Sequence, residues 1–496
     1  MIYKKDKDII KSYFSDYSGI TNGFADAVIL VESEKEVIDF LIASSKSKTP
    51  VSISGAGTGV TGGRVPFGGV VLSMELLNKI ISIDKIHNTI TVQSGVSVKT
   101  IKETAATIGC IFAPDPTEQN SSIGGNLATN ASGSRGLKYG PTRNHVLHLR
   151  VVLSNGEVLN LTRGQCISDN NGQLKLPTLS GKTISVTLPK YTLPQIKNAA
   201  GYYNNQPADA IDIFIGQEGT LGVITEVELK LLPQKNKLIS GVVFFRDMRN
   251  SWKFVANAKK NITTKSSGKN QIEPMSLEYY DKNALGLLIS SYPLIPTYAD
   301  AAIFFEQEVD TQVQDEAIIS AQWAKLIEES GASIDDVWFS SSTSSLQETF
   351  RLMRHSLPEK VNEIVAKNKL PKVGTDIAVP DKSFSEMLEF YYAQFASCAM
   401  QWLVFGHIGE SHLHANILPK TQDEYFKSKE LYLLLVKKAI SLGGTVSAEH
   451  GIGKLKHLFL SEMIGKNGMK ELSIFKKQLD PASILCPDNI FPKELL

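Results

Sequence analysis

One stretch of the sequence is so rich in glycine that it constrains the fold more than any other. Residues 55–69, GAGTGVTGGRVPFGG, contain seven glycines. Glycine adopts positive φ angles without a steric penalty and lets other groups approach the backbone closely. A loop of this composition after a strand can present several backbone N–H groups to a diphosphate. A tight turn between two strands explains the same residues, so this stretch alone leaves both interpretations open.

The glycine-rich stretch does not match the Rossmann dinucleotide motif. Gly55, Gly57 and Gly59 lack the GxGxxG spacing that opens a helix, and no helical pattern follows them. A second polar segment, residues 113–140, has few side chains that could form a core. Loops longer than about 12–15 residues without secondary structure are usually functional or disordered. Flanking strands argue against disorder, so the second segment favours the ligand-binding interpretation.

The overall composition argues against several classes of protein. Lysine and arginine number 52 against 51 acidic residues, and this balance argues against a nucleic-acid partner. The cysteines form no CxxC pair, which argues against a disulfide framework, a zinc ribbon and an iron–sulfur cluster. No stretch approaches the ~20 apolar residues that span a bilayer. We therefore expect a cytoplasmic protein without a transmembrane segment, and peripheral contact with the inner membrane stays open.

Hydrophobic periodicity changes character near the middle of the chain. Residues 27–54 predict a strand, a helix and a second strand, and residues 212–233 predict a turn followed by a long strand. After Pro233 long helices alternate with apolar strands, with helices at 311–330 and 343–367 and strands at 241–246 and 301–306. A chain of 496 residues is long enough for two or three domains, or for one large domain that carries an insertion.

Two histidines flank a short polar loop within LVFGHIGESHLHANIL, residues 403–418. The apolar runs on either side predict a β-hairpin. If residues 409–412 form its turn, His407 and His414 face one another, close enough to share a metal. Strand alternation places Asn416 on the same face as His414. Without a third ligand, a hydrogen-bonded structural histidine is the more common explanation.

A carboxylate and an imidazole stand side by side in SAEHGIGKLK, residues 447–456. Glu449 would complete a site with His407 and His414, and three protein ligands leave a position open for substrate. Zinc or another divalent ion suits this donor set. A capping carboxylate next to a surface histidine, His450, explains the same pair, so the residues alone leave both interpretations open.

The two polar loops together resemble the FAD-binding domain of the vanillyl-alcohol oxidase superfamily, the PCMH-type fold. In that family the first loop wraps the FAD pyrophosphate, the second lines the flavin, and a Gly-Val-Ile-Thr strand returns to the adenine. The resemblance implies cofactor contacts from Gly55, Ala56, Gly57, Thr58, Gly59, Pro114, Asp115, Thr117, Gly124, Gly125, Asn126, Thr129, Ser132, Gly133, Val223 and Ile224. The first loop contains no histidine for covalent attachment, so non-covalent FAD is expected.

The C-terminal half is similar to the FAD-linked oxidase branch that contains D-lactate dehydrogenase, the glycolate oxidase flavoprotein subunit and D-2-hydroxyglutarate dehydrogenase. Its marks are Gly-His-x-Gly-x-x-x-x-His, Ser-Ala-Glu-His-Gly-x-Gly and Leu-Asp-Pro-x-x-Ile-Leu, all present here. The resemblance implies a divalent metal, zinc first and manganese or iron as alternatives, on His407, His414 and Glu449. It also implies His450 as the catalytic base, with substrate-binding residues Arg354, Asn416 and Lys372.

The same resemblance implies an α+β architecture in which one domain is inserted into another. We expect a PCMH-type FAD-binding domain of two subdomains at 1–232. An α+β cap of antiparallel sheet and helices follows at 233–440 and carries the histidine hairpin. The C-terminal segment, 441–496, is expected to return to the FAD domain.

The implied activity is FAD-dependent, metal-assisted oxidation of a small D-2-hydroxy acid, D-lactate first, to the 2-oxo acid, with hydride transfer to flavin N5. The alternatives are D-2-hydroxyglutarate or glycolate dehydrogenation, and a flavoprotein subunit that is active only with iron–sulfur partners. An enzyme of the ether-lipid or sugar-oxidising branches is a further alternative, which the predicted metal ligands disfavour. The electron acceptor stays open among a quinone, a cytochrome, an electron-transfer flavoprotein and a dye, and a homodimer stays open too.

The chain departs from the family pattern in two segments. The family commonly has Gly-Asp-Gly-Asn-Leu-His where this chain has Gly-Glu-Ser-His-Leu-His, residues 409–414, so His412 is an additional histidine. It could be an alternative ligand, a residue that supports a ligand, or a turn residue, and the retained acidic residue Glu410 favours the turn residue. Cys486 stands where asparagine is usual, which puts a flavin contact there in doubt.

Overall fold

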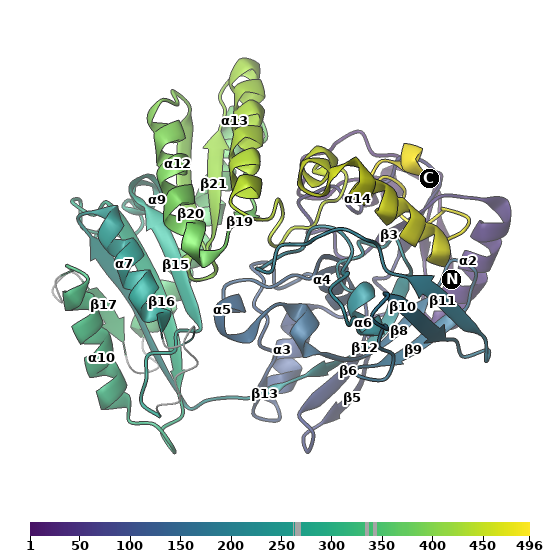
Figure 1. Cartoon of the computed structure of the whole chain (residues 1–496), viewed down its shortest axis with the longest axis horizontal. Helices are drawn as coiled ribbons and strands as arrows, with labels where there is room; N and C mark the ends of the chain where they lie inside the picture. Colours follow the sequence, from purple (N-terminus) through teal and green to yellow (C-terminus); the bar gives the residue numbers. More distant parts are fainter. Residues whose placement is uncertain (261, 263–268, 333–336, 341–344) are drawn as a thin grey trace. The chain divides into compact units, whose positions relative to one another are not determined.

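The computed structural model describes residues 1–260, 262, 269–332, 337–340 and 345–496 (Figure 1). Contacts divide the chain into two units, of which unit 1 comprises Met1–Ser132, Pro141–Gln234 and Thr445–Leu496. Unit 2 comprises Gly133–Gly140 and Lys235–Gly444. Because unit 2 interrupts unit 1 in the sequence, the predicted α+β fold with an inserted domain is confirmed.

The first sheet of unit 1 is built around a parallel core. Its strands lie in the order β1 (Ile2–Lys4), β2 (Ala27–Leu30), β4 (Val70–Ser73) and β3 (Val51–Ser54). Both β2 and β3 run parallel to β4 because helix α2 (Glu34–Ser47) carries the chain back between them. Ser33 begins this helix, since its Oγ accepts a hydrogen bond from the Glu36 N–H at 3.3 Å. The predicted strand, helix and strand over 27–54 are therefore confirmed.

The second sheet of unit 1 is antiparallel throughout. Its strands lie in the order β5 (Ile80–Asp84), β6 (Thr89–Gln93), β12 (Val223–Lys230), β8 (Val146–Val152) and β9 (Val158–Thr162). Two smaller pairs are β10 (Gln173–Pro177) with β11 (Thr183–Thr187), and β7 (Cys110–Ile111) with β13 (Leu232–Pro233). The helices of unit 1 are α1 (Lys7–Ile10), η1 (Lys11–Tyr13), α3 (Val98–Ala106), α4 (Ile123–Thr129), η2 (Thr142–His145), α6 (Ala210–Ile213), α14 (His457–Leu479) and η6 (Lys493–Leu495).

The polar segment 113–140 is not a continuous loop, so that prediction is wrong in part. Helix α4 begins at the N-cap Ser122, whose Oγ accepts from the Gly125 N–H at 3.4 Å. The Gly124 N–H donates to the Ser94 carbonyl at 2.8 Å, and a Cβ on Gly124 would lie 2.8 Å from the Ser94 Cβ. Tertiary packing of a side-chain-free surface thus outweighs the poor helix propensity of glycine here.

Unit 2 is built on one antiparallel sheet. Its strands lie in the order β17 (Val337–Ser340), β14 (Lys237–Phe245), β16 (Ala301–Val309), β15 (Ser276–Asp281), β20 (Gln401–Gly406), β21 (His412–Leu418) and β18 (Val373–Gly374), and β19 (Ile377–Ala378) also pairs with β21. The helices described in unit 2 are α5 (Gly136–Tyr139), α7 (Met248–Ala258), α9 (Lys282–Leu288), α10 (Glu316–Glu329), α11 (Ser345–Asn368), η4 (Asp381–Ser383), α12 (Phe384–Ala396), η5 (Ile408–Glu410) and α13 (Gln422–Ser441). Residues 343 and 344 of the predicted helix 343–367 lie outside the described residues.

Helices pack on both faces of this sheet. Phe305 of β16 stacks on Trp323 of α10 with ring centroids 4.1 Å apart, and its neighbour Phe304 meets Phe350 of α11 at 6.5 Å. Neighbouring strand residues point to opposite faces, so α10 and α11 cover opposite sides. Burying each such aromatic side chain stabilises the fold by about 1.5–3 kcal/mol. The sheet is thereby a rigid support for the β20–β21 hairpin.

No helix in the described ranges combines the length and the apolar character that crossing a membrane requires.

Candidate functional site

The glycine-rich loop of unit 1 begins directly after β3. Gly57 has a φ of 78°, and a Cβ there would overlap the guanidinium of Arg64. A Cβ on Gly55 would lie 2.5 Å from the Ser122 Oγ. Among the described residues, the backbone N–H groups of residues 56–60 donate no hydrogen bond. Such N–H groups, in a loop without obstructing side chains, fit a diphosphate. All the residues predicted to wrap the pyrophosphate lie in this loop: Gly55, Ala56, Gly57, Thr58 and Gly59.

Most of the predicted flavin-lining residues lie in and before α4, and Ser132 and Gly133 follow it. Gly124, Gly125, Asn126 and Thr129 belong to this helix, and the Thr129 hydroxyl donates to the Gly125 carbonyl at 3.2 Å. Pro114, Asp115 and Thr117 precede the helix. The Asp115 carboxylate lies 2.5 Å from the Lys102 Nζ, so this side chain has a structural partner within the protein.

The predicted adenine-side residues begin the central strand β12. Val223 and Ile224 pair with Val152 and Val151 of β8, whereas the ladder with β6 starts at Glu226. Both side chains are buried. A cofactor contact at this position would therefore come from the backbone.

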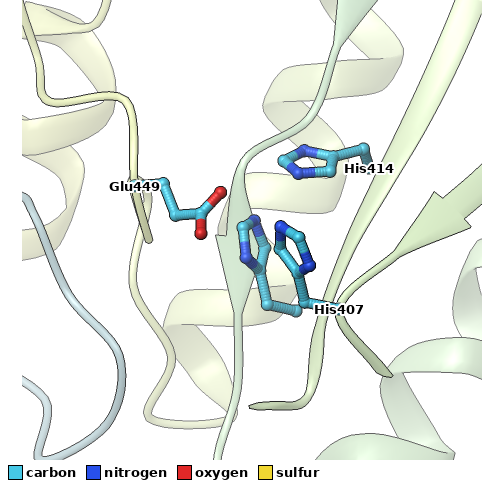
Figure 2. Close-up of side chains that lie close together, drawn as sticks. His407, His414 and Glu449 are labelled. Atoms are coloured by element: carbon cyan, nitrogen blue, oxygen red, sulfur yellow. The ribbon is translucent and has the colours of Figure 1, made fainter. Parts of the chain in front are cut away.

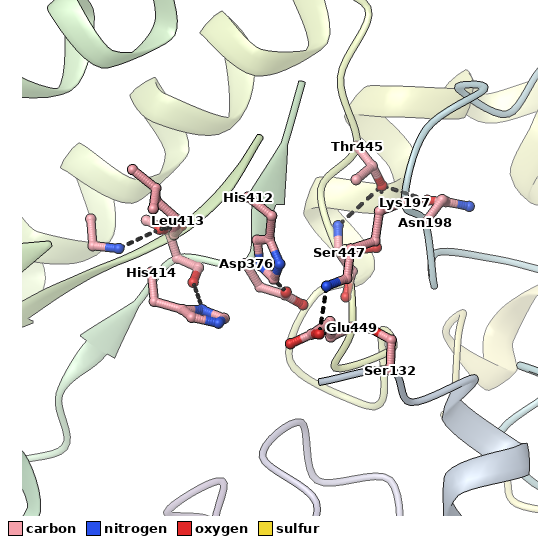
Figure 3. Close-up of polar contacts among 12 residues, drawn as sticks. Ser132, Lys197, Asn198, Asp376, His412, Leu413, His414, Thr445, Ser447 and Glu449 are labelled. Carbon is pink, nitrogen blue, oxygen red and sulfur yellow. Dashed lines mark hydrogen bonds and ion pairs between the residues drawn. The ribbon is translucent and has the colours of Figure 1, made fainter. Parts of the chain in front are cut away.

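Glu449 is held by a cation and a hydroxyl within unit 1. The Lys197 Nζ lies 2.7 Å from Glu449 Oε1, and the Ser132 hydroxyl donates to the same oxygen at 2.7 Å (Figure 3). Ser132 was expected next to the flavin, and the structure gives its hydroxyl this second role. Lys197 was not predicted at all, and no sequence pattern marks it.

The backbone after Glu449 is fixed by two further groups of unit 1. The buried Glu218 carboxylate accepts the N–H groups of Ile452 and Gly453, both at 2.7 Å. Burial raises the pKa of Glu218 to about 7. The Thr61 hydroxyl donates to the His450 carbonyl at 3.2 Å. These contacts leave the Glu449 and His450 side chains on an anchored segment.

The β20–β21 hairpin of unit 2 is confirmed, but its predicted register is wrong by two residues. His414 pairs with Phe405, and the His412 N–H donates to the His407 carbonyl at 3.2 Å. The connection consists of η5 and Ser411, whose φ is 52°, so it begins one residue earlier than predicted. His407 therefore lies opposite His412. His414 still lies on the same side, because it is two residues further along β21.

Three imidazoles of unit 2 converge at this hairpin. The ring centroid of His407 lies 5.4 Å from that of His412 and 5.6 Å from that of His414. Each ring offers a nitrogen, and these nitrogens lie within 4.8 Å of one another. Figure 2 shows the side chains of His407 and His414. The His407 Nδ1 lies 2.7 Å from Glu278 Oε1, and the His414 Nδ1 lies 3.0 Å from the Thr375 carbonyl oxygen. This arrangement fits a divalent ion that prefers nitrogen ligands.

The expectation that His412 is a turn residue is wrong. It is the first residue of β21, its side chain is 0% exposed, and its Nε2 lies 3.1 Å from Asp376 Oδ1 (Figure 3). The early turn places residue 412 in the strand, facing inwards, rather than in the loop.

Arg354 and Arg351 differ clearly in their surroundings on α11. The Arg354 Nε lies 3.6 Å from Glu278 Oε2, and both side chains are nearly buried. Arg351 is 57% exposed and pairs with Glu348 on the helix surface. Glu278 thus contacts both Arg354 and His407, and it was missed in the sequence. Its only signal is an acidic residue within the apolar strand SLEYYD.

Lys372, which directly precedes β18, contacts Asn416 of the hairpin. The Lys372 Nζ donates to Asn416 Oδ1 at 2.8 Å, and the Asn416 side-chain amide donates to the His414 carbonyl at 3.1 Å. Lys372 is exposed as a whole residue, but protein atoms surround its side-chain ammonium. This desolvation lowers the pKa of Lys372 to about 8. Both polar groups are thereby placed next to the histidines.

Comparisons with known proteins show the family to which the chain is related. The family model described as "FAD binding domain" matches residues 25–162, and "FAD linked oxidases, C-terminal domain" matches residues 246–490. D-lactate dehydrogenase of Anaerostipes hadrus is 30% identical over 482 residues, which cover 94% of this chain and 90% of the relative. The glycolate oxidase subunit GlcD of Bacillus subtilis is 29% identical over 477 residues, with coverages of 95% and 89%. D-2-hydroxyglutarate dehydrogenase of Xanthomonas citri is 26% identical over 476 residues, with coverages of 94% and 89%.

Among solved structures, alkyldihydroxyacetonephosphate synthase matches with a TM-score of 0.65 at 16% identity, over 98% of this chain and 83% of that one. At this identity the likeness shows the fold alone. Together with the matched FAD-binding domain, it confirms the predicted PCMH-type architecture.

The fold and the two matched domains define a flavin-dependent oxidoreductase. More particularly, the chain belongs to the family of FAD-linked oxidases.

Proposed function

We propose that this enzyme oxidises a small D-2-hydroxy acid, D-lactate first, to the 2-oxo acid with the help of a divalent metal. The metal, zinc first, would be held by His407, His414 and Glu449. One observation carries the proposal: His407 and His414 each have Nδ1 next to an oxygen acceptor, which orients Nε2 for a metal. The relatives named D-lactate dehydrogenase support the substrate class.

The flavin would be held without a covalent bond by the glycine-rich loop and the residues around α4. The N–H groups of residues 56–60 would bind the diphosphate. Bound FAD would supply the acceptor for the hydride that leaves the substrate α-carbon. The protein's own task is then to hold the substrate and to remove the hydroxyl proton.

His450 is the group that would accept this proton. An unperturbed imidazole has a pKa of about 6.5, so a side chain of this type can act as a base close to neutral pH. A metal on the neighbouring Glu449 would lower the pKa of a substrate hydroxyl. Thr61 holds the His450 carbonyl, and Glu218 holds the next peptide groups, so the base has a fixed backbone.

The substrate carboxylate needs a cation with a defined geometry. Arg354 can make paired hydrogen bonds to a carboxylate, and its near-complete burial limits competition from water. Lys372 and Asn416 would contact the other polar groups of the substrate. Arg354 and His407 both contact Glu278. The residue proposed to bind the carboxylate and the residue proposed to bind the metal are therefore connected through one side chain.

Steady-state assays of the purified single chain with an artificial dye test this proposal. D-lactate, L-lactate, glycolate and D-2-hydroxyglutarate would be compared at matched concentrations, before and after removal of metal by EDTA. We expect the highest kcat/KM with D-lactate, little turnover of the L-isomer, and loss of activity on chelation that added metal reverses. Equal turnover of both lactate enantiomers would contradict the proposed stereochemistry.

Oxidation of D-2-hydroxyglutarate or glycolate is the second candidate, because relatives with these names match the chain over similar lengths. The Bacillus relative is named a subunit, which supports a third possibility, a flavoprotein that needs iron–sulfur partners. Flavin reduction by substrate without any dye turnover would favour that subunit role. Turnover by the single chain would exclude it.

A further inference from the structure

His412 is the one histidine of the hairpin that the family pattern does not have. Its ring centroid lies 4.5 Å from that of His414 and 5.4 Å from that of His407. All three residues belong to unit 2 and to one β-hairpin, so their mutual geometry does not depend on any other part of the chain. The extra histidine therefore stands within the cluster and not beside it.

Each imidazole of this cluster has an oxygen acceptor at one of its nitrogens. His407 uses Glu278, and His414 uses the Thr375 carbonyl. His412 has Asp376 Oδ1 at 3.1 Å from Nε2, and both of these side chains are 0% exposed. Metal-bound histidines almost always have such a partner on the second nitrogen, because it fixes the ring and its tautomer. For His412 this oxygen is an ion-pair contact, whereas those of His407 and His414 are hydrogen bonds.

The electrostatics of the three clustered imidazoles also favour a bound cation. Three imidazoles so close together, those of His407 and His412 buried and that of His414 half-buried, cannot all be protonated without strong mutual repulsion. Three neutral rings offer nitrogen lone pairs to a common space, and a divalent ion satisfies them together. The nearby carboxylates of Glu278 and Asp376 add the negative charge that favours such an ion.

We propose that His412 is a metal ligand, so that unit 2 supplies three imidazoles, His407, His412 and His414, to the bound ion. Asp376 is then a positioning residue that holds the His412 ring. This inference rests on one part of the proposed function, the binding of a divalent metal at the hairpin. It changes the metal preference, because a site richer in imidazole suits zinc, cobalt, nickel or iron better than manganese.

X-ray absorption at the zinc edge of the zinc-loaded, flavin-containing enzyme tests the ligand number without any substitution. Multiple scattering from imidazole rings distinguishes two histidine ligands from three. We expect three, and a fit that requires only two imidazoles would overturn the inference. A protein that retains no stoichiometric zinc would instead overturn the proposed metal site itself.

Three variants extend the test. His412→Asn installs the residue of the family pattern, Asp376→Asn removes the positioning acceptor, and His87→Asn is the control, because His87 is an exposed residue of unit 1. Metal affinity would be measured by chelator competition, and the donor set by the visible spectrum of the Co²⁺ form. Thermal unfolding without metal would confirm that each variant folds.

We expect His412→Asn to weaken zinc binding by more than about 100-fold, since loss of an outer partner alone costs about 10- to 100-fold. It should also lower the preference for zinc over manganese and change the Co²⁺ spectrum. Asp376→Asn should weaken zinc binding by about 10- to 100-fold, and His87→Asn should leave it unchanged. An unaltered zinc affinity and Co²⁺ spectrum in a folded His412→Asn protein would overturn the inference, while the proposed function would stand.

Discussion

The carboxylate of Glu278 lies 2.7 Å from the Nδ1 of His407, and its other oxygen lies 3.6 Å from the Nε of Arg354. One buried acidic residue of β15 thus orients a predicted metal ligand and a predicted substrate-binding arginine. A substitution of Glu278 should therefore affect both His407 and Arg354, although Glu278 itself would contact neither metal nor substrate.

Glu278→Gln should lower the metal affinity by about 10- to 100-fold, because an amide is a weaker acceptor for the His407 Nδ1–H than a carboxylate. Metal content after dialysis and zinc affinity by chelator competition measure this effect. Glu329→Gln is the control, because Glu329 is 58% exposed on α10 of the same unit. Equal zinc affinities in the two variants would contradict the role of Glu278.

Arg354→Lys should reduce kcat/KM for the hydroxy acid by about 10- to 100-fold. The reason is that lysine cannot make paired hydrogen bonds to a carboxylate, and a hydrogen bond to a charged group contributes about 1.5–3 kcal/mol. Arg351→Lys is the matched control, since Arg351 lies on the same helix and pairs with Glu348 at its surface. Similar losses in both variants would show that Arg354 does not bind the substrate.

Gly57→Ala should reduce the flavin content of the purified protein. The new methyl group would overlap the Arg64 guanidinium and narrow the loop that is to hold the diphosphate. Gly181→Ala is the control, because Gly181 also has a positive φ, of 85°, but no heavy atom within 4 Å of its added Cβ. The ratio of flavin to protein absorbance should fall in the first variant and stay constant in the second. Full flavin content in Gly57→Ala would contradict the assignment of this loop.

Much of the fold could be predicted because local patterns and tertiary structure agree. The β2–α2–β3 unit has a clear capping residue in Ser33, and the hairpin at 403–418 has two apolar strands around a polar turn. Helix α4 was missed because Gly124 and Gly125 are poor helix formers, and the helix is supported by a contact of Gly124 with Ser94. The sequence does not encode that contact locally.

The site could be predicted in outline, but its supporting residues could not. Motifs mark His407, His414 and Glu449 as candidate ligands. Glu278, which contacts His407, and Lys197, which contacts Glu449, come from distant segments without a local pattern. The position of His412 depended on a two-residue difference in register, which the hydrophobic pattern does not determine because a shift of two preserves alternation. Its inward orientation therefore emerged only from the folded hairpin.

Lys197→Met should destabilise the metal-free protein by about 3–5 kcal/mol, because it removes the Lys197 cation from a nearly buried pair with the Glu449 carboxylate. Added zinc should restore part of this loss, since the ion supplies a new positive partner. Urea unfolding measures both effects. Lys182→Met should cost less than about 1 kcal/mol, because Lys182 is 73% exposed in its pair with Glu157. Equal costs in the two variants would contradict this account of the Lys197–Glu449 pair.

Glu218 should make the stability depend on pH. Burial raises its pKa from 4.5 to about 7, so between these values the folded chain keeps a proton that the unfolded chain has lost. The free energy of unfolding therefore falls as pH rises through this window, by up to about 3 kcal/mol from this group. Glu218→Gln should remove that component, which urea unfolding from pH 5 to pH 8 measures. An identical pH dependence in the wild-type protein and the variant would contradict the raised pKa.

The central claim, metal-assisted oxidation of a D-2-hydroxy acid by the flavin, is tested most directly by anaerobic flavin reduction. The FAD-containing enzyme would be mixed with D-lactate in a stopped-flow instrument as isolated, after removal of metal, and after zinc is added back. We expect rapid bleaching of the oxidised flavin, loss of this phase without metal, and its recovery with zinc. Equally fast bleaching in the metal-free enzyme, or no bleaching by any D-2-hydroxy acid in the zinc-loaded enzyme, would contradict the central claim.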